Sequence, residues 1–491
     1  MHHRRHSLRV IGVFGCFGCG SVVAWLLAAL VACGVPRAFA QPSMQTILTN
    51  GPVSNRLNIV VLSEGYTSSQ LAQFSVDATN AVKALLSHQP YQEYSNYFNG
   101  YAIKVASSQS GSTHPVDGIT NNTYFNSIYD PVSDKLLTIP PNWADANYSH
   151  GQGKVDALLQ TFMPNCQLPV LLVNDLYYEG GSDGFYKTAI ASTGALLNEM
   201  PPWPPGMLTH ETGHVLANLS DEYTYTNAYA GAPSTEGWNT TQQTNRTLIK
   251  WNVWVSTNTP IPTPDGWDYG DNVIGLFQGA QYHANNWYRP ELNCAMNTVG
   301  VPFCSVCSEA LVLAIYQRVR PVDAFSPAGT NFSVTTTQAL AFSVTLLQPA
   351  THNLNVQWCT NGVPRTGATN ASFTLLPQSF ANGTNWVSAV VKDNTPLVRN
   401  DPTNLLSQTL SWTLNVSIPQ LHLDSPRWLT GGKFAFRITG TAPQGVVVQS
   451  STNLSSWGPV ATNSLVSGQL WYTNSSASGS PRRFYRATTP P

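Results

Sequence analysis

The chain has 491 residues, of which 42% are hydrophobic, so it is long enough for two to four domains with buried cores. Only 10% of the residues are charged, and 24 Lys and Arg nearly balance 25 Asp and Glu, which gives a formal net charge of −1. This composition argues against wholesale disorder and against a polytopic membrane protein, and it lacks the basic field that nucleic-acid binding needs. We therefore expect a globular protein with no nucleic-acid partner.

The first 40 residues have the pattern of an export signal. Three arginines within residues 4–9 precede an apolar stretch at 10–32, and Ala38-Phe39-Ala40 fits a signal-peptidase site. We therefore predict a signal peptide at 1–40 and an extracellular or periplasmic protein. The paired arginines also fit a twin-arginine signal, and a retained membrane anchor is the alternative interpretation. Leu30-Val31-Ala32-Cys33 resembles a lipobox, whose cysteine would make the protein a cell-surface lipoprotein.

Residues 41–325 alternate strand patterns with helix patterns. Apolar runs predict strands at 57–62, 101–106, 168–173 and 185–192. Apolar residues at helical spacing predict helices at 68–86, 154–162, 207–219 and 305–320. Because strands that alternate with helices form largely parallel sheets with covered faces, we predict an α/β (α+β) domain built on such a sheet.

Residues 326–491 have a different sequence pattern. Short strands separated by Gly, Asn, Pro and Thr predict an immunoglobulin-like β-sandwich at 326–418, with Trp358 in its core. These strands are expected at 332–334, 340–346, 353–358, 372–375, 386–391 and 410–416. Residues 419–491 again alternate strands and turns, which predicts a small all-β C-terminal domain. Neither segment contains a group of residues typical of a catalytic site. We therefore expect these two segments to be spacers, stabilisers or modules for attachment to a cell surface or a glycan.

One short motif carries the chemistry. His210-Glu211-Thr212-Gly213-His214 places two imidazoles one helical turn apart, where both can reach a single zinc ion. Apolar residues around the motif predict a buried helix, in which two imidazoles and a carboxylate need a cation. We predict one catalytic Zn²⁺ held by His210 and His214. Glu211 would be the catalytic general base, because zinc makes water acidic enough for a carboxylate to deprotonate.

The third zinc ligand must come from beyond the helix. On a straight helix Asp221 would lie about 10 Å beyond His214, too far to share one metal ion. The helix must therefore end, and Asn218 is the residue best suited to the left-handed conformation of the turn that follows. We predict Asp221 as the third ligand, with Glu222 as the alternative. The carboxylate that does not bind zinc is expected to hold a ligand imidazole through its free N–H.

The motif and its surroundings resemble the bacterial IgA-peptidase family of zinc metallopeptidases. The resemblance covers about residues 45–325 and rests on the HExxH motif, on Leu219-Ser220-Asp221-Glu222-Tyr223, and on short motifs between Ile274 and Cys307. Asn58 to Thr67 also matches, although Ser63-Glu64 stands where the family has Asp. The resemblance implies a metzincin-like fold with a twisted sheet and a methionine turn beneath the metal, in which Met296 would be the methionine. Ala217 departs from the glycine that metzincins carry there.

Five cysteines follow the predicted signal peptide, namely Cys166, Cys294, Cys304, Cys307 and Cys359. A structural zinc on the three central ones would need a fourth ligand, and the sequence shows none at a recognisable spacing. Because an exported chain meets oxidising conditions, we expect instead a disulfide from Cys294 to Cys304 or Cys307.

Several other side chains are weaker candidates. Tyr223, Tyr282 and Tyr288 are candidates to donate a hydrogen bond to the oxyanion, with core packing as the alternative. His283 is a candidate further ligand or an ordinary polar contact. The strand expected at 185–192 could pair its edge with an extended substrate, which favours endopeptidase action.

Together these patterns predict a secreted, monomeric zinc metalloendopeptidase that acts on a protein or peptide substrate. Two alternatives remain. One is a cell-surface binding or adhesion protein with a vestigial metal site, against which the intact Glu211 argues. The other is a zinc amidase or deacetylase acting on cell-wall or glycan material, which the sequence does not exclude.

Overall fold

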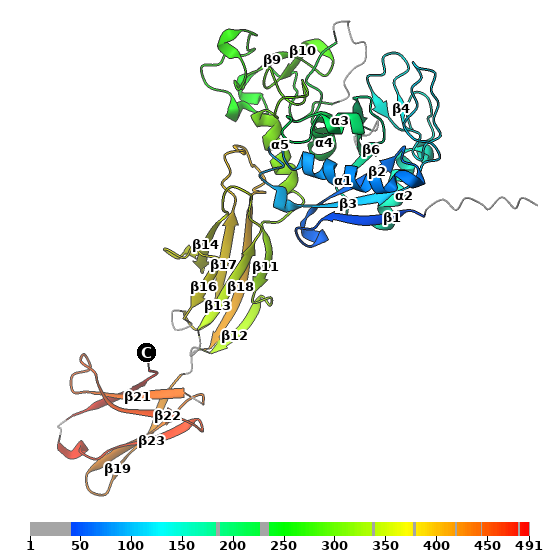
Figure 1. Cartoon of the computed structure of the whole chain (residues 1–491). Coiled ribbons are helices and arrows are strands. Elements are labelled where there is room, and N and C mark those ends of the chain that lie inside the picture. Colours follow the sequence, from blue (N-terminus) through cyan, green and yellow to red (C-terminus); the bar gives the residue numbers. More distant parts are fainter. Residues whose placement is uncertain are drawn as a thin grey trace, which may run out of the picture. The chain divides into compact units, whose positions relative to one another are not determined.

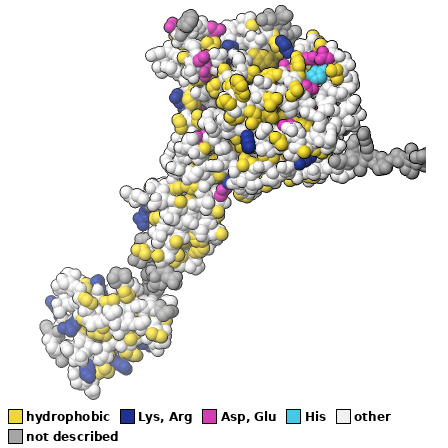
Figure 2. Space-filling model, in the orientation of Figure 1, with side chains coloured by type: hydrophobic (Ala, Val, Ile, Leu, Met, Phe, Trp, Pro, Cys, Tyr) yellow, Lys and Arg dark blue, Asp and Glu magenta, His cyan; other side chains and the backbone are white. Residues whose placement is uncertain are grey.

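The computed structural model describes residues 41–182, 187–225, 235–335, 339–376, 380–417, 420–442, 444–479 and 482–490. The signal peptide predicted at 1–40 lies outside these residues. Within them the chain is mixed α/β, with many strands and few helices (Figure 1). None of the helices in the described part is both long and apolar enough to cross a membrane. The face seen in Figure 2 carries only scattered charged side chains, in keeping with the low charged content of the sequence.

A six-stranded sheet organises the N-terminal part of the chain, with the strand order β1-β3-β2-β6-β8-β7. The strands are β1 (Ser43–Leu48), β2 (Leu57–Glu64), β3 (Phe98–Lys104), β6 (Leu168–Val173), β7 (Gly180–Ser182) and β8 (Ala189–Ser192). The four inner strands run parallel, whereas β1 and β7 pair antiparallel at the two edges. The prediction of a mostly parallel sheet is therefore confirmed.

Helices cover both faces of this sheet. They are α1 (Leu71–Leu85), α2 (Gln152–Phe162), α3 (Thr193–Leu197), α4 (Met207–Ala217) and α5 (Ser305–Tyr316). Because successive strand residues point to opposite faces, Ile59 and Val61 of β2 join the apolar cluster of α1, α4 and α5. Val60 and Leu62 join the cluster of α2 on the other face. The four predicted helices are present, and the described residues contain one further α-helix, the short α3, that was not predicted.

Two short strand pairs lie outside the main sheet. They are β4 (Ile128–Tyr129) with β5 (Leu137–Thr138), and β9 (Phe277–Ala280) with β10 (His283–Arg289). At the end of β2, Glu64 accepts hydrogen bonds from the backbone N–H groups of Phe125 and Ser127, each at 2.9 Å. Glu64, which stands where the resemblance led us to expect Asp, therefore holds the loop that leads to β4.

The strand predicted at 185–192 differs from the structure in an important way. Its described part forms a strand only as β8, and Phe185 lies outside the described residues. Both sides of β8 are occupied, by β6 and by β7. The prediction that this strand offers a free edge is therefore wrong, because the preceding segment returns as β7 and takes the edge position.

Two further sheets enclose a separate apolar cluster. Their strands are β11 (Val322–Ser326), β12 (Asn331–Thr335), β13 (Leu340–Leu346), β14 (Asn355–Thr360), β15 (Val363–Pro364), β16 (Ser372–Leu375), β17 (Gly383–Lys392) and β18 (Ser407–Ser417). One sheet has the order β11-β13-β16 and the other β12-β18-β17-β14-β15. Trp358, Phe342 and Trp412 are buried together in this cluster, which confirms the predicted core position of Trp358.

The C-terminal segment is all-β in its described part. Its strands are β19 (His422–Leu429), β20 (Lys433–Thr439), β21 (Gln444–Ser451), β22 (Gly458–Leu465), β23 (Gln469–Asn474) and β24 (Phe484–Thr488). They form two three-stranded sheets around a small cluster that includes Phe436, Ile438 and Val448. The boundaries at 325/326 and 418/419 stay predictions.

Polar contacts join residues on either side of position 325. The hydroxyl groups of Tyr94 and Tyr316 donate to Oδ2 of Asp393 at 2.9 and 2.7 Å. His352 lies between two carboxylates, with Nδ1 2.7 Å from Oε1 of Glu93 and Nε2 2.7 Å from Oδ1 of Asp393. Burial lowers the pKa of His352, but Asp393 and Glu93 outweigh it and raise the pKa above its ordinary value. The two carboxylates therefore favour the protonated form of this ring, which bridges the two segments.

Candidate metal centre

Helix α4 carries the HExxH motif and is capped by a residue outside the helix. Its N-cap residue, Gly206, has no side chain that could accept from the first turn. Instead Glu199 accepts from the backbone N–H groups of Leu208 and Thr209, both at 2.9 Å. A buried carboxylate there satisfies two N–H groups and lies at the positive end of the helix dipole. No local pattern indicates this role, because Glu199 precedes the helix and stands outside any capping motif.

Helix α4 ends at Ala217, early enough for the chain to bring the third ligand back to the two histidines. Asn218 is left-handed, with φ 51° and ψ 43°, as predicted. The N–H of Asn218 donates to the carbonyl of His214 at 3.0 Å, and that of Leu219 to the carbonyl of Gly213 at 3.3 Å. This is the hydrogen-bonding pattern of a helix that stops and reverses. The turn brings the following segment, with Asp221, back to the helix.

Three acceptor atoms converge at this point. Oδ1 of Asp221 lies 3.2 Å from Nε2 of His210 and 3.3 Å from Nε2 of His214. The two Nε2 atoms are 3.2 Å apart. Ligands bound to a tetrahedral zinc at about 2.0–2.1 Å are separated by about 3.3 Å, so this triangle has the dimensions of three corners of such a site.

Backbone carbonyls orient the two imidazoles. Nδ1 of His210 donates to the carbonyl of Ala295 at 2.7 Å, and Nδ1 of His214 donates to that of Leu219 at 2.6 Å. When Nδ1 carries the proton of a neutral imidazole, Nε2 presents a lone pair to the centre of the triangle. The prediction that the second carboxylate, Glu222, holds a ligand imidazole is therefore wrong, because carbonyl groups do so.

Asp221 uses its two oxygens differently. Oδ2 accepts a hydrogen bond from the hydroxyl of Tyr282 at 2.5 Å, whereas Oδ1 is buried without a hydrogen-bond donor among the described residues. Burial opposes ionisation of Asp221, but its interactions with His214 and then His210 lower its pKa well below the usual range. A buried anionic oxygen facing two nitrogen lone pairs fits a divalent cation, so the donor set matches zinc.

Glu211 lies at the edge of the triangle. It is 5% exposed, and its Oε1 is 4.0 Å from Nε2 of His210. Burial raises its pKa, although the two imidazoles of the motif oppose that effect. Its carboxylate is thus next to the proposed ligand atoms without lying at a bonding position, which is where a general base for an attacking water must stand.

The three tyrosine candidates have different surroundings. Tyr282 is committed to Asp221, and Tyr288 is buried in the main apolar cluster. Tyr223 is partly exposed, and burial followed by the charge of Asp221 raises its pKa, so its hydroxyl stays protonated. Of the three candidates, Tyr223 is therefore the one that is both accessible to solvent and able to offer a protonated hydroxyl near Glu211 and Asp221. His283 lies in β10 and stacks on Trp287, with ring centroids 6.3 Å apart.

Met296 packs against the motif helix, as the resemblance implied. It is fully buried, and a Cβ built on Gly213 would lie 3.0 Å from its Sδ. The backbone N–H of Glu222 donates to the carbonyl of Met296 at 2.8 Å. The 294–296 segment therefore supports the site twice, through the helix and through the chain that carries Asp221.

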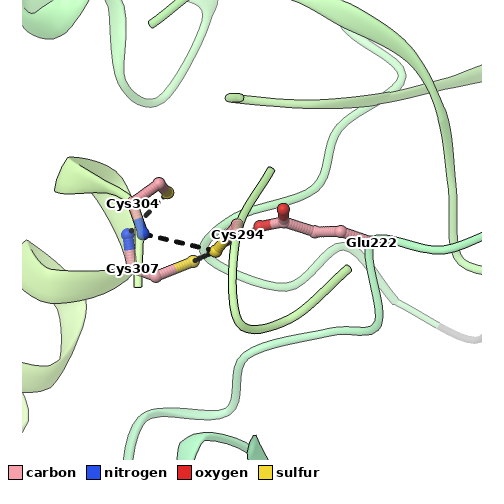
Figure 3. Close-up of side chains that lie close together, drawn as sticks. All are labelled: Glu222, Cys294, Cys304 and Cys307. Carbon is pink, nitrogen blue, oxygen red and sulfur yellow. Dashed lines mark hydrogen bonds between the residues drawn. The ribbon is translucent and has the colours of Figure 1, made fainter. Parts of the chain in front are cut away.

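The predicted disulfide is absent from the structure. All five cysteines after residue 40 are free thiols, and the sulfurs of Cys294 and Cys307 are 3.6 Å apart, far beyond a bond of about 2.05 Å. These two residues instead gather with Cys304 and Glu222 in one buried group (Figure 3). Glu222, the alternative to Asp221 as third zinc ligand, thus belongs to a different cluster. Nothing in local spacing pointed to it, because Glu222 is 85 positions from Cys307.

A motif helix with two histidines, joined by a carboxylate that returns from a turn, is the arrangement of a metallopeptidase. A family model described as IgA Peptidase M64 matches residues 46–272 and 268–315, more than half of the chain. The chain therefore belongs to the IgA peptidase M64 family.

The other comparisons add little. No curated protein matches the chain. Among solved structures, the chain is similar to the apo structure of Bacteroides uniformis beta-glucuronidase 3, with 9% identity and a TM-score of 0.14. The match covers 44% of this chain and only 30% of that one. A superposition of this quality carries no argument about fold or activity.

Proposed function

We propose that this protein is a secreted zinc-dependent metalloendopeptidase. His210, His214 and Asp221 hold the zinc ion, and Glu211 is the general base. The observation that carries the proposal is the triangle of two Nε2 atoms and Oδ1, with sides of 3.2–3.3 Å and no buried proton donor for that oxygen among the described residues. The export pattern at 1–40 supports secretion.

The side chains divide the reaction between them. Zinc, when bound, would supply a Lewis acid that polarises the scissile carbonyl and lowers the pKa of a water molecule. Glu211 takes the proton from the attacking water and then delivers it to the leaving amine. The protonated hydroxyl of Tyr223 donates a hydrogen bond to the carbonyl oxygen as negative charge develops on it.

Strand β7 is the better candidate for binding an extended substrate. It is one of the two antiparallel edge strands of the main sheet, and it lies against the helix that carries the motif. A Cβ on Gly180 would fall 2.3 Å from Cγ of Met207, the first residue of α4. A peptide that adds to this edge would run past the metal centre, and edge pairing needs no chain terminus, which favours endopeptidase action.

We infer a metzincin-like peptidase domain from the mostly parallel sheet, whose antiparallel edge strand β7 lies next to the motif helix, and from Met296 packed under that helix. We infer an immunoglobulin-like fold for the two-sheet segment from its buried Trp358 and Trp412 and from the parallel pairing of β12 with β18. Attachment to a cell surface or glycan remains the proposed role of the C-terminal modules, and a monomer the proposed assembly.

The decisive test is Glu211→Gln. The substitution keeps shape but removes the base, so we expect full zinc content and a loss of peptide hydrolysis of at least about 100-fold. A digest of proteome-derived peptides read by mass spectrometry measures cleavage, and elemental analysis measures zinc. Glu236→Gln, at an exposed glutamate paired with Lys250, is the matched control and should cleave normally.

Two results would overturn the proposal. One is hydrolysis at the wild-type rate by Glu211→Gln, or by wild-type protein stripped of metal with a chelator. The other is release of acetyl or amide groups from cell-wall glycans with no cleavage of any peptide in the same assay, which would assign the centre to an amidase or deacetylase.

A further inference from the structure

A second cluster of metal-binding side chains lies beside the first. One ligand atom from each of Glu222, Cys294, Cys304 and Cys307 falls within 4.8 Å of every other, and all four residues are buried. Figure 3 shows the four side chains converging from three separate segments of the chain. Three thiols and a carboxylate are the donor set and number of a closed tetrahedral zinc site.

The distances fit ligands that share an ion. Two thiolates bound to a tetrahedral zinc at about 2.3 Å are about 3.8 Å apart. The sulfurs of Cys294 and Cys307 are 3.6 Å apart, and Sγ of Cys307 lies 3.3 Å from Oε1 of Glu222. These separations are close to the edges of such a tetrahedron and well outside those of a covalent bond between sulfurs.

Backbone N–H groups are directed at the sulfurs. The N–H of Cys304 donates to Sγ of Cys294, and the N–H of Cys307 donates to Sγ of Cys304, both at 3.4 Å. Cys304 is also the N-cap of α5, so its sulfur lies at the positive end of the helix dipole. Such donors stabilise thiolates, the form in which cysteine binds a metal.

The carboxylate of Glu222 is not satisfied by the protein alone. Oε1 accepts from Nδ2 of Asn239 at 2.7 Å, but Oε2 is buried without a donor among the described residues. The nearby cation, Arg289, directs its Nη1 at the carbonyls of Gln278 and Gly279. A fully buried carboxylate with an unpaired oxygen is costly, and a divalent cation removes that cost.

The cluster also explains how the catalytic centre is held. Glu222 directly follows Asp221, and Cys294 directly precedes Ala295, whose carbonyl orients His210. Cys304 and Cys307 begin the helix α5 that packs against α4. An ion at the cluster would tie together the three segments that position the HExxH site.

We propose that Glu222, Cys294, Cys304 and Cys307 form a structural site for a thiophilic divalent cation, of which zinc is the natural candidate. Binding releases the thiol protons, so no oxidant is needed and the three sulfurs are protected from oxidation. This proposal does not rest on the proposed peptidase activity, because the cluster shares no ligand with the HExxH centre.

The test uses the full chain and does not depend on activity. Elemental analysis should find two zinc ions per chain in the wild type and one in His214→Ala. After replacement of zinc by Co²⁺, both proteins should show sulfur-to-cobalt charge-transfer absorption, because His214→Ala leaves the thiolate site intact. Alkylation in denaturant with chelator, read by peptide mass spectrometry, should label Cys294, Cys304 and Cys307 as free thiols.

Variants assign the ligands. Cys307→Ser should lose the charge-transfer absorption, whereas Cys166→Ser, which removes a thiol far from the cluster in sequence, should keep it. Glu222→Gln should retain the absorption but lose this metal to a chelator more readily. Its metal affinity should fall by more than the roughly ten-fold that the loss of a group outside the ligand set costs. The wild-type spectrum and labelling decide the question even if Cys307→Ser fails to fold.

Three outcomes would overturn the site. A linked peptide between Cys294 and Cys304 or Cys307 would establish the disulfide instead. Free thiols with a single zinc per chain and no cobalt–thiolate absorption would establish a metal-free thiol cluster. Unchanged metal retention in Glu222→Gln would remove the carboxylate from the ligand set. In each case the peptidase proposal would stand, because it is tested by Glu211→Gln.

Discussion

At the scale of single residues, the hydroxyl of Tyr282 fixes the orientation of the Asp221 carboxylate. It donates to Oδ2, so Oδ1 is left pointing at the two imidazoles. Groups that hold a metal ligand in this way contribute to affinity without touching the ion. Sequence patterns identified Tyr282 only as a candidate oxyanion donor, because a contact across 61 positions leaves no local signature.

We predict that Tyr282→Phe weakens zinc affinity by about 10- to 100-fold while the fold persists. Asp221→Asn should cost more, because a neutral amide replaces the anionic ligand. Competition with a zinc-sensitive chelating dye measures both. Tyr177→Phe, at a half-exposed tyrosine, is the control and should match the wild type. Wild-type affinity in Tyr282→Phe would show that the hydrogen bond does not orient the ligand.

At the scale of elements, the end of α4 decides whether the third ligand reaches the metal. Asn218 takes the left-handed conformation, which costs most side chains about 1–2 kcal/mol. The sequence predicted this turn correctly, because the two histidines fix the helix and a third ligand cannot lie further along it. It could not predict the cap at the other end, since Glu199 reaches the helix through tertiary folding alone.

We predict that Asn218→Ala destabilises the peptidase domain by about 1 kcal/mol, whereas Asn218→Gly does not. The alanine variant should also lose zinc more readily, because any shift of the turn moves Asp221. Urea unfolding followed by tryptophan fluorescence and zinc retention measure the two effects. Equal behaviour of the two variants would mean that the backbone conformation here is not limiting.

Strong local patterns explain which elements the sequence predicted. The strands β6, β13 and β16 were predicted with their observed bounds, because each is a short apolar or alternating run between turn residues. Strand β1 was missed, since most of Ser43–Leu48 is exposed and its place comes from pairing with β3. The prediction of a disulfide in place of the thiol cluster failed for the same kind of reason, because Glu222 joins the three cysteines only in three dimensions.

At the scale of the whole molecule, His352 makes the contact across position 325 sensitive to pH. Its ring bridges Glu93 and Asp393, and Asp393 also accepts from Tyr94 and Tyr316. The pKa of His352 is raised in the folded chain above its ordinary value of 6.5. The imidazolium therefore contributes stability that is fully present below the unfolded pKa and is lost as pH rises through the folded pKa.

We predict that wild type exceeds His352→Gln in thermal stability most below about pH 6 and that the difference shrinks as the pH rises past the raised pKa. Thermal scans from about pH 5 to pH 9 at fixed ionic strength measure it. His422→Gln, at an exposed histidine of β19, is the control for replacing a histidine by glutamine. A difference that grows with pH would contradict the assignment.

The same junction limits how the protein can be divided. Leu347 and Leu406, which belong to the following two-sheet segment, are buried in the apolar cluster of α1, α4 and α5. Glu309 of α5 accepts backbone hydrogen bonds from Arg399 and Asn400 at 2.6 and 3.1 Å. A recombinant fragment that stops at residue 325 would expose apolar surface and leave the hydroxyls of Tyr94 and Tyr316 without their acceptor. A soluble, crystallisable fragment therefore has to extend through β18.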